Sequence, residues 1–372
     1  MKNTTRGKRP LVADKRSGST SAKKPTTPRK RPVKRRKPTP PRRGGIIGFF
    51  LMILRFFVRL FWAVTWRGTL AVVVVIGLWV GYTATTLPDL EELLDGRARG
   101  SVTLKDYQGA TFAWRGDQFG GVVTAQTVSP NLLHAIVATE DKRFYKHIGV
   151  SPRGIASAIR INLREGRGPL DGHGGSTITQ QVAKLLCLGT PYDPTTGQTE
   201  KEYEQECRRG TLQRKIYEAV YAMAMEAKYS KEGILTIYMN RAFLGAGARG
   251  FEAASQRYFG KSAASVTPAE AAMLAGLLVA PTRFAPTNDL ARSQNRAATI
   301  IRLMNEQGYL TNAEAAEAQA HPAELSQAAA ARAGGYFADW VMSSGPEFFT
   351  RKTTEDVIIR TTLDQRIHSV TL

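Results

Sequence analysis

The chain has 372 residues and a formal net charge of +21, a length that allows a large buried core and two or three domains. Residues 1–45 contain 17 of its 52 lysine and arginine residues and a single acid, Asp14, so this stretch alone carries +16. The other residues carry only +5 of the +21, which excludes a protein that is basic over its whole surface.

The basic stretch 1–45 is rich in proline, threonine and serine and contains almost no apolar residues. Such a segment buries too little apolar surface to offset its ordering entropy, so we expect a disordered tail. Its charge suits either nucleic acid or an anionic membrane surface. Because a hydrophobic segment follows directly, we predict the membrane surface and no nucleic acid partner.

Two apolar segments follow the tail. Leu70 to Leu87 holds 18 residues without a charge, and we predict a single transmembrane helix over residues 68–87. Residues 46–67 are equally apolar but include Arg55 and Arg59 on one helical face, a pattern typical of an amphipathic helix in the membrane interface. A hairpin of two spanning helices is the alternative, although arginine in the hydrocarbon core is costly.

The charges that flank the apolar segments predict their orientation. Basic residues precede them, and acids follow at once, beginning with Asp89. The positive-inside rule places the N-terminus in the cytoplasm and residues 88–372 outside. We therefore expect a single-pass protein of the cell inner (cytoplasmic) membrane, with its catalytic part on the periplasmic or extracellular side.

The exported part begins with residues 88–128, for which we predict a linker containing a short β-hairpin around Asp106-Tyr-Gln-Gly109. A main helical domain over 129–345 is expected next. Its first helix starts at Ser129-Pro130 and carries the apolar stripe Leu133, Ile136 and Val137.

Glu140 occupies the next position of that stripe, where the period calls for an apolar residue. A carboxylate held against apolar neighbours has a raised pKa, which suits proton transfer near neutral pH. The alternative is that the stripe ends and Glu140 lies at the surface.

A second helix is predicted from Ser151-Pro152, and a glycine-rich loop, 172–176, leads into a third. Thr177-x-x-Gln180 has capping-box spacing, so we expect the loop to reach a helix N-terminus that can bind an anion. The second helix should bury Ile155, Ala158, Ile159 and Leu163. The third should have a polar face formed by Gln180, Gln181 and Lys184.

The only cysteines, Cys187 and Cys207, frame a polar insert over residues 188–210. Outside the cytoplasm, one disulfide and two unpaired structural cysteines both fit this pattern.

The helix predicted over Thr211–Lys228 has two distinct faces. Its expected core face consists of Ile216, Ala219, Val220, Met223, Ala224 and Ala227. The opposite face carries Arg214, Glu218, Tyr221 and Met225, with Lys215 at its flank, and we interpret it as the wall of a covered cleft. Further helices are expected at 231–240, from Thr267-Pro268, at 289–307 and at 312–320, so residues 129–320 should be mostly helical.

Four stretches together resemble the peptidoglycan glycosyltransferase family (glycosyltransferase family 51) of class A penicillin-binding proteins. They are Glu140-Asp-Lys-Arg-Phe-Tyr-Lys-His147, Gly174-Gly-Ser-Thr-Ile-Thr-Gln-Gln181, Arg214-Lys-x-x-Glu218 and Lys231-x-x-Ile-x-x-x-Tyr-x-Asn240. The resemblance covers about residues 85–345, and a fifth motif survives only as Arg296 with Met304 downstream. Ser151 and Leu185 depart from the family pattern, and the insert lengthens the loop before Arg214.

The resemblance implies a mainly α, lysozyme-like domain with a small jaw lobe against the membrane. The implied reaction is an inverting hexosyl transfer that polymerises lipid II into β-1,4 glycan strands and releases undecaprenyl pyrophosphate. Glu140 would be the general base and Glu218 the second carboxylate, which positions cations near the pyrophosphate. Lys184, Arg214 and Lys215 would offset the charge of the leaving group.

The resemblance also implies a set of substrate-binding residues: Ser176, Thr177, Gln180, Gln181, Phe144, His147 and Asn240, the last as a residue that shapes the cleft. It implies a divalent metal, Mg²⁺, for which Asp141 and Glu218 are the candidate ligands. The implied partners are lipid II, the growing glycan strand, the membrane and proteins of cell-wall synthesis.

The C-terminal residues 346–372 resemble the start of a linker to a transpeptidase domain, with Val357-Ile-Ile-Arg-Thr-Thr-Leu-Asp-Gln-Arg366 at its centre. No acylating serine occurs in a credible setting. We therefore expect either a truncated bifunctional enzyme or one reduced to polymerase work. The rival functions are a lysozyme-like lytic enzyme and a non-enzymatic membrane protein with a nucleic-acid-binding tail.

Overall fold

The structure is a computed structural model that describes residues 46–94, 102–115, 121–168, 174–190, 192–207, 209, 211–326, 329, 335–344 and 357–364. The predicted basic tail, His173 of the glycine-rich loop and Arg366 lie outside these residues. The chain divides into two units, Met1–Trp66 and Arg67–Leu372.

Helix α1 (Ile46–Thr86) runs without interruption through both predicted apolar segments. Its stretch Gly48–Thr86 is long and apolar enough to cross a membrane, with a mean hydropathy of 1.8. The alternative hairpin of two spanning helices is therefore wrong, while the assignment of residues 46–67 to the membrane interface and 68–87 to the membrane span stays a prediction. The junction contains no proline, and its one glycine, Gly68, costs a helix only about 1 kcal/mol.

The second unit is mostly helical, as predicted for residues 129–320, and the mainly α class is confirmed. Its helices are α2 (Leu90–Leu94), α3 (Pro130–Glu140), α4 (Pro152–Arg164), α5 (Ile178–Leu185), α6 (Glu200–Cys207), α7 (Leu212–Lys228), α8 (Lys231–Arg241), α9 (Phe251–Phe259), α10 (Pro268–Gly276), α11 (Pro281–Phe284), α12 (Leu290–Glu306), α13 (Asn312–Ala320) and α15 (Gly335–Ser344). Short 3₁₀ turns are η1 (Phe144–Lys146), η2 (Cys187–Gly189), η3 (Pro194–Thr196) and η4 (Ala263–Ser265).

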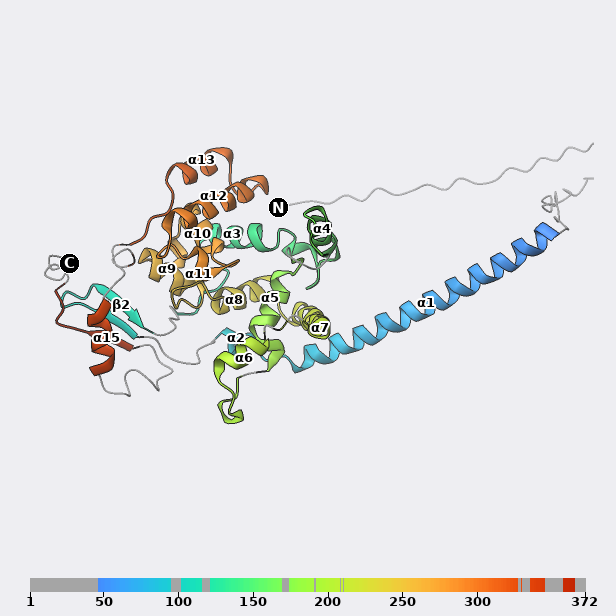
Figure 1. The fold of residues 1–372 in the computed structure, drawn as a ribbon, viewed down its shortest axis with the longest axis horizontal. Helices are drawn as coiled ribbons and strands as arrows, with labels where there is room; N and C mark the ends of the chain where they lie inside the picture. Colours follow the sequence, from blue (N-terminus) through green and yellow to red (C-terminus); the bar gives the residue numbers. More distant parts are fainter. Residues whose placement is uncertain are drawn as a thin grey trace, which may run out of the picture. The chain divides into compact units, whose positions relative to one another are not determined.

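Two groups of helices share one hydrophobic core. Helices α3, α10 and α12 pack on one another, and α5 packs against α7 and α8 (Figure 1). Helix α8 is buried along its length, and Ile234 and Ile237 are fully covered, as predicted. The C-terminal end of α1 also contacts this group, because the rings of Trp79 and Tyr217 meet edge-on with centroids 5.1 Å apart.

The predicted burial was wrong for most of one helix and for part of another. In α4 only Ala158 of the predicted face is buried, whereas Ile155 and Leu163 are 41% and 56% exposed. In α7 the predicted core residues Val220 and Ala224 are buried, but Ile216 is 50% exposed, and the opposite face with Glu218 and Tyr221 is buried as well. Both helices lie at the edge of the domain, where apolar periodicity alone does not show which face meets the core.

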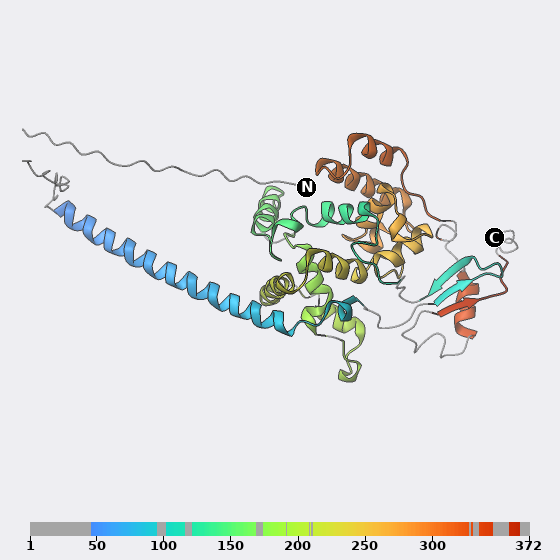
Figure 2. The same ribbon diagram turned by 180° about the vertical axis from the view of Figure 1, so that it is seen from behind.

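A small sheet forms a second core. Strands β1 (Val102–Lys105) and β2 (Thr111–Arg115) make the predicted antiparallel hairpin, and β3 (Val357–Arg360) pairs with β1 in parallel, giving the order β2-β1-β3. Figure 2 shows α15 beside this sheet, where the rings of Phe112 and Phe337 lie 5.8 Å apart.

The boundaries predicted for this region are therefore corrected. Helix α15, assigned to the 129–345 domain, packs with the sheet, and the 346–372 segment supplies a strand where a linker was expected. The β-branched run Val357-Ile-Ile359 favours that strand.

Candidate functional site

Glu140 is the last residue of α3 and lies at the meeting point of three helices. Its Oε2 accepts a hydrogen bond of 2.8 Å from Nε2 of Gln181 on α5. The Oε1 of that amide accepts a bond of 2.9 Å from the hydroxyl of Tyr238 on α8. We call Glu140, Gln181 and Tyr238 the base cluster.

The pKa of Glu140 is raised, chiefly because burial desolvates its charged form. The bond from Gln181 and the positive charge of Arg296 lower the pKa by less, and the neighbouring Asp141 adds to the rise. The interpretation of Glu140 as a surface residue at the end of the stripe is therefore wrong. Leu133 of that stripe is only half-buried, and Leu132 occupies the core in its place.

Asp141 is committed to structural contacts. Its Oδ2 lies 2.7 Å from Nε2 of His147 and accepts a 3.2 Å bond from the backbone N–H of Ile178. His147 Nδ1 accepts from Gly149 N, which places the ring proton on Nε2 toward Asp141. The predicted anion site at the α5 N-terminus is therefore occupied by the chain's own carboxylate, and neither Asp141 nor His147 is open to a ligand.

Thr177 and Gln180 form the predicted capping box. The Thr177 hydroxyl accepts from Gln180 N at 3.1 Å, and Gln180 Oε1 accepts from Thr177 N at 3.1 Å. The same hydroxyl donates to Gly149 O, which ties α5 to the loop after η1. Gly149 has φ +88°, and a Cβ there would lie 2.6 Å from Ala222 O. Thr177 and Gln180 thus act by positioning the start of α5.

The side chains of Lys215, Ser176 and Glu218 form a second group, which we call the lysine cluster. Lys215 Nζ donates to Ser176 Oγ at 2.8 Å and to Glu218 Oε1 at 2.5 Å. The carboxylate is buried and the lysine side chain is 49% exposed. The lysine cluster joins the loop before α5 to helix α7. Gln181 of the base cluster lies on α5, and Ser176 of the lysine cluster lies just before it.

Arg214 precedes this lysine on α7. Its Nη1 donates to the backbone carbonyl of Glu206 at 2.8 Å, and its Nη2 is buried without a hydrogen-bond partner among the residues that the structure describes. Lys184 projects from the last turn of α5 and is exposed. The three predicted cations therefore lie on α5 and α7, the pair of helices that pack against each other.

Two predicted substrate-binding residues are buried elsewhere. The Phe144 ring is fully covered and lies under the Lys231 ammonium, 4.4 Å from the ring centroid, so it has no exposed surface for the predicted substrate contact. Asn240 bonds both backbone groups of Val123, at 3.0 and 2.7 Å, which fits the predicted shaping role.

Some important residues were missed by sequence reasoning. The sequence pattern does not single out the Tyr238 hydroxyl, although Tyr238 belongs to the fourth motif. Glu226, buried on α7, accepts from Thr179 Oγ1 at 2.6 Å and from Lys231 Nζ at 2.7 Å. Through these two contacts, Glu226 of α7 links α5 to the start of α8.

The two candidate metal ligands, Asp141 and Glu218, differ in how far their oxygens are already occupied. Among the described residues, no group of three or more histidine, cysteine, aspartate or glutamate side chains is placed to hold a metal ion. Asp141 does not fit, because His147 Nε2 and Ile178 N both bond its Oδ2, and Arg143 N donates to its Oδ1. Glu218 does fit Mg²⁺ in one way, since this ion often binds through one carboxylate together with substrate phosphates.

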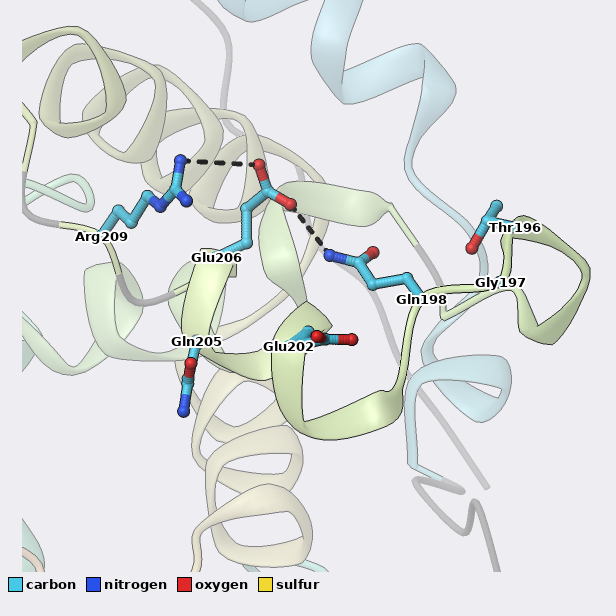
Figure 3. Close-up of a pocket in the computed structure, with 7 residues that line it drawn as sticks. All are labelled: Thr196, Gly197, Gln198, Glu202, Gln205, Glu206 and Arg209. Carbon is cyan, nitrogen blue, oxygen red and sulfur yellow. Dashed lines mark hydrogen bonds and ion pairs between the residues drawn. The ribbon is translucent and has the colours of Figure 1, made fainter.

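The polar insert lies between α5 and α7 in the sequence. It is closed by a Cys187–Cys207 disulfide, with Cα atoms 5.2 Å apart. It contains a hollow of about 710 Å³ (Figure 3). All the residues that line it belong to the insert: Thr196, Gly197, Gln198, Glu202, Gln205, Glu206 and Arg209. The hollow therefore includes no member of the base cluster or the lysine cluster.

Comparison with known proteins identifies the family. The sequence profile described as Transglycosylase matches residues 109–305, more than half of the chain. The chain belongs to the transglycosylase family. This confirms the resemblance drawn from the four motifs, and both clusters of this transglycosylase lie inside the matched range.

Relatives of the transglycosylase are named as penicillin-binding proteins. Penicillin-binding protein 1A of Aquifex aeolicus (strain VF5) is 34% identical over 276 residues, which cover 73% of this chain and 35% of that protein. Penicillin-binding protein 1A of Escherichia coli (strain K12) is 33% identical, over 66% of this chain and 27% of that protein. The chain thus spans about a third of the length of these relatives, or less.

Among solved structures, the crystal structure of penicillin-binding protein 1A from Haemophilus influenzae matches with a TM-score of 0.38 and 19% identity. The match covers 73% of this chain and 28% of that one.

Proposed function

We propose that this transglycosylase polymerises lipid II into β-1,4 glycan strands, with Glu140 as the general base. The observation that carries the proposal is the base cluster: a desolvated carboxylate of raised pKa, held in place by one directed amide. Glu140 takes the proton from the sugar 4-hydroxyl of the acceptor, and that oxygen attacks the anomeric carbon of the donor. The bond from this carbon to the phosphate oxygen breaks, and undecaprenyl pyrophosphate leaves.

The lysine cluster and Arg214 support the second half of this step. A departing pyrophosphate develops negative charge, and fixed donors aimed at such charge lower the barrier. Lys215 is held by Ser176 and Glu218, so its ammonium reaches the substrate without a large ordering cost. Ser176, Gln181 and Lys184 are proposed to contact the substrate, and Asn240 to shape the cleft around it.

We further propose that Glu218 holds Mg²⁺ when the pyrophosphate supplies the remaining ligands. The bound ion would offset phosphate charge, a task that it would share with Lys215. In the absence of the ion, the Lys215 ammonium already occupies the Glu218 carboxylate.

Exposed apolar residues support an enzyme that works at a membrane. Ile148, Ile155 and Leu163 are 73%, 41% and 56% exposed, and Leu212 of α7 is 75% exposed. Surfaces of this kind mark contact with a lipid or a partner. We propose that they meet the outer face of the membrane that α1 crosses, with the N-terminus in the cytoplasm. The growing strand and cell-wall synthesis proteins are the proposed partners.

A lytic glycosidase is the rival that the two carboxylates also allow, since such enzymes use a carboxylate pair. Hydrolysis of a glycan has no pyrophosphate leaving group and does not require the cations on α5 and α7. Those cations therefore favour the polymerase.

Labelled lipid II, incubated with the full chain in detergent micelles, separates the two functions. The proposal predicts polymeric glycan together with released undecaprenyl pyrophosphate. Lys215→Ala and Lys184→Ala should each lower the rate, by on the order of 10²–10³ for a lost donor. Cleavage of preformed glycan strands with no consumption of lipid II would overturn the polymerase assignment in favour of the lytic one.

A further inference from the structure

A hydrogen bond links the insert between α5 and α7 to an arginine of the third motif. Its last helix, α6, ends at Cys207, which is bonded to Cys187 just beyond α5. The residue before that cysteine, Glu206, offers its backbone carbonyl to Arg214 Nη1 at 2.8 Å. A covalent anchor and the acceptor for a motif arginine are thus adjacent in the chain.

Helix α6 is short and largely exposed. It has 8 residues, and Glu202, Gln205 and Glu206 are exposed, while the Tyr203 hydroxyl donates to Thr190 O near the disulfide. A helix this short is marginal without external support. The disulfide fixes its C-terminal end, where the unpaired carbonyls carry partial negative charge and attract a guanidinium.

The Glu206 side chain does not share this task. Figure 3 shows its carboxylate between Gln198 and Arg209, and its oxygens lie 3.1 Å from Gln198 Nε2 and 3.9 Å from Arg209 Nη1. The Glu206 carboxylate therefore lines the hollow of the insert, while the backbone carbonyl of the same residue accepts the hydrogen bond from Arg214.

Arg214 is consequently held through one nitrogen and carries an unpaired donor at the other. Nη1 is bound to the fixed carbonyl, and the buried Nη2 has no partner among the described residues. A guanidinium can donate to two acceptors in one plane, and phosphate oxygens suit that geometry.

We propose that the Cys187–Cys207 bridge is a positioning element of the transglycosylase site, which fixes the Glu206 carbonyl and thereby aims Arg214 at a phosphate oxygen of the substrate. The proposal rests on the proposed function in one respect, namely that Arg214 offsets pyrophosphate charge. The bridge acts through Arg214 alone and touches no substrate. The insert therefore affects turnover although its hollow contains no site residue.

A double-mutant cycle in the full chain tests the proposal. Cys187→Ser with Cys207→Ser should lower kcat for lipid II polymerisation about tenfold through misplacement of one donor. Arg214→Ala should lower it on the order of 10²-fold. In the Arg214→Ala background, removal of the bridge should change kcat by less than about twofold, because both changes act through the same contact.

Two further measurements complete the test. Gln205→Ala alters the exposed surface of α6 without touching the bridge or the carbonyl, and it should leave kcat unchanged. The dissociation constant of inorganic pyrophosphate, measured by calorimetry, should rise in the bridge variant and in Arg214→Ala, and no further when the two are combined. This readout does not depend on polymerisation, so it tests the positioning even if lipid II is not the substrate.

The outcomes are distinct. Losses that multiply in the combined variant, or a bridge variant that polymerises and binds pyrophosphate like the parent, would overturn the positioning role. If Arg214→Ala alone keeps full pyrophosphate affinity and full kcat, the charge-offsetting role of Arg214 fails, and the positioning role fails with it. A parent protein that binds pyrophosphate through Arg214 but makes no glycan would overturn the proposed reaction and keep the positioning role.

Discussion

Tyr238 sets the direction of the hydrogen bond that reaches Glu140. Its buried hydroxyl donates to Gln181 Oε1, which leaves Gln181 Nε2 to donate to the carboxylate. Burial and the nearby Glu140 charge raise the pKa of Tyr238 well above its ordinary value, so the hydroxyl stays protonated. The amide is thereby kept from rotating its oxygen toward Glu140.

Tyr238→Phe should therefore shift the pH dependence of the enzyme. The Gln181 bond lowers the pKa of Glu140, so a weakened bond raises that pKa further. The acid limb of the kcat/KM profile should move to higher pH by up to about one unit, the equivalent of one hydrogen bond. Tyr258→Phe is the matched control, because Tyr258 is also buried and donates to a carbonyl, Leu244 O, outside both clusters. A profile that is unmoved in Tyr238→Phe, or equally moved in both variants, contradicts this role.

The identities of the site residues were more predictable than their roles. Glu140 could be predicted because it interrupts an apolar stripe, and Lys215 because it lies beside Glu218 in a motif. Thr177 and Phe144 were assigned to the substrate, yet one caps a helix and the other lies in the core. A sequence motif indicates that a residue belongs to the site. The contacts of its side chain depend on how α3, α5 and α8 pack together.

At the scale of elements, the start of α5 holds the site together. Its capping box, the Asp141 carboxylate on Ile178 N and the Thr177 hydroxyl on Gly149 O all meet within one turn. Loss of that order would displace Gln181 and Ser176, one from each cluster.

Thr177→Ala should lower both stability and activity. Loss of an N-cap costs about 1 kcal/mol of unfolding free energy. Thr311→Ala removes the same kind of capping box from α13, which contains no site residue, and should cost a similar amount of stability. Denaturant unfolding and polymerisation rates of both variants test this. If the two variants lose activity equally, the α5 cap has no special role in the site.

Helix ends were read from the sequence more accurately than helix faces. The capping boxes at Thr177, Thr267 and Thr311 are all present, because each depends on residues three apart. The predicted buried face was wrong for most of α4 and for part of α7. A helix at the edge of a domain can leave apolar residues uncovered by its own chain when they contact another surface.

At the scale of the whole molecule, long-range pairing was the least predictable feature. The register Val102↔Val357 joins two strands that are more than 250 residues apart in the sequence, and no local pattern in either strand indicates its partner. The hairpin β1–β2, in contrast, was predicted from its own alternation and turn.

The exposed apolar residues of α4 lead to a prediction about the membrane. A nitroxide attached after Leu163→Cys should be relaxed more by lipid-soluble oxygen than by a water-soluble nickel chelate when the full chain is in liposomes. A nitroxide after Trp340→Cys is the control, because Trp340 is also exposed, at 60%, but lies on α15 beside the sheet. Equal accessibility to the chelate at both positions would mean that α4 faces water.

The central claim is that Glu140 accepts the proton from the acceptor. Because burial raises its pKa, the folded state disfavours ionised Glu140; this penalty is absent below the unfolded pKa, grows as pH rises from the unfolded to the folded pKa, and is fully present above the folded pKa. Glu140→Gln removes the base and the penalty together, so the variant should unfold at neutral pH no more easily than the parent.

The most direct test is the initial rate of lipid II polymerisation by the full-length Glu140→Gln variant, alongside its melting temperature. General-base catalysis supplies roughly 10²–10⁴ in rate, so polymerisation should fall by that factor while the melting temperature is maintained. A loss below about tenfold would contradict the account, and a marked fall in melting temperature with activity retained would make Glu140 a structural carboxylate.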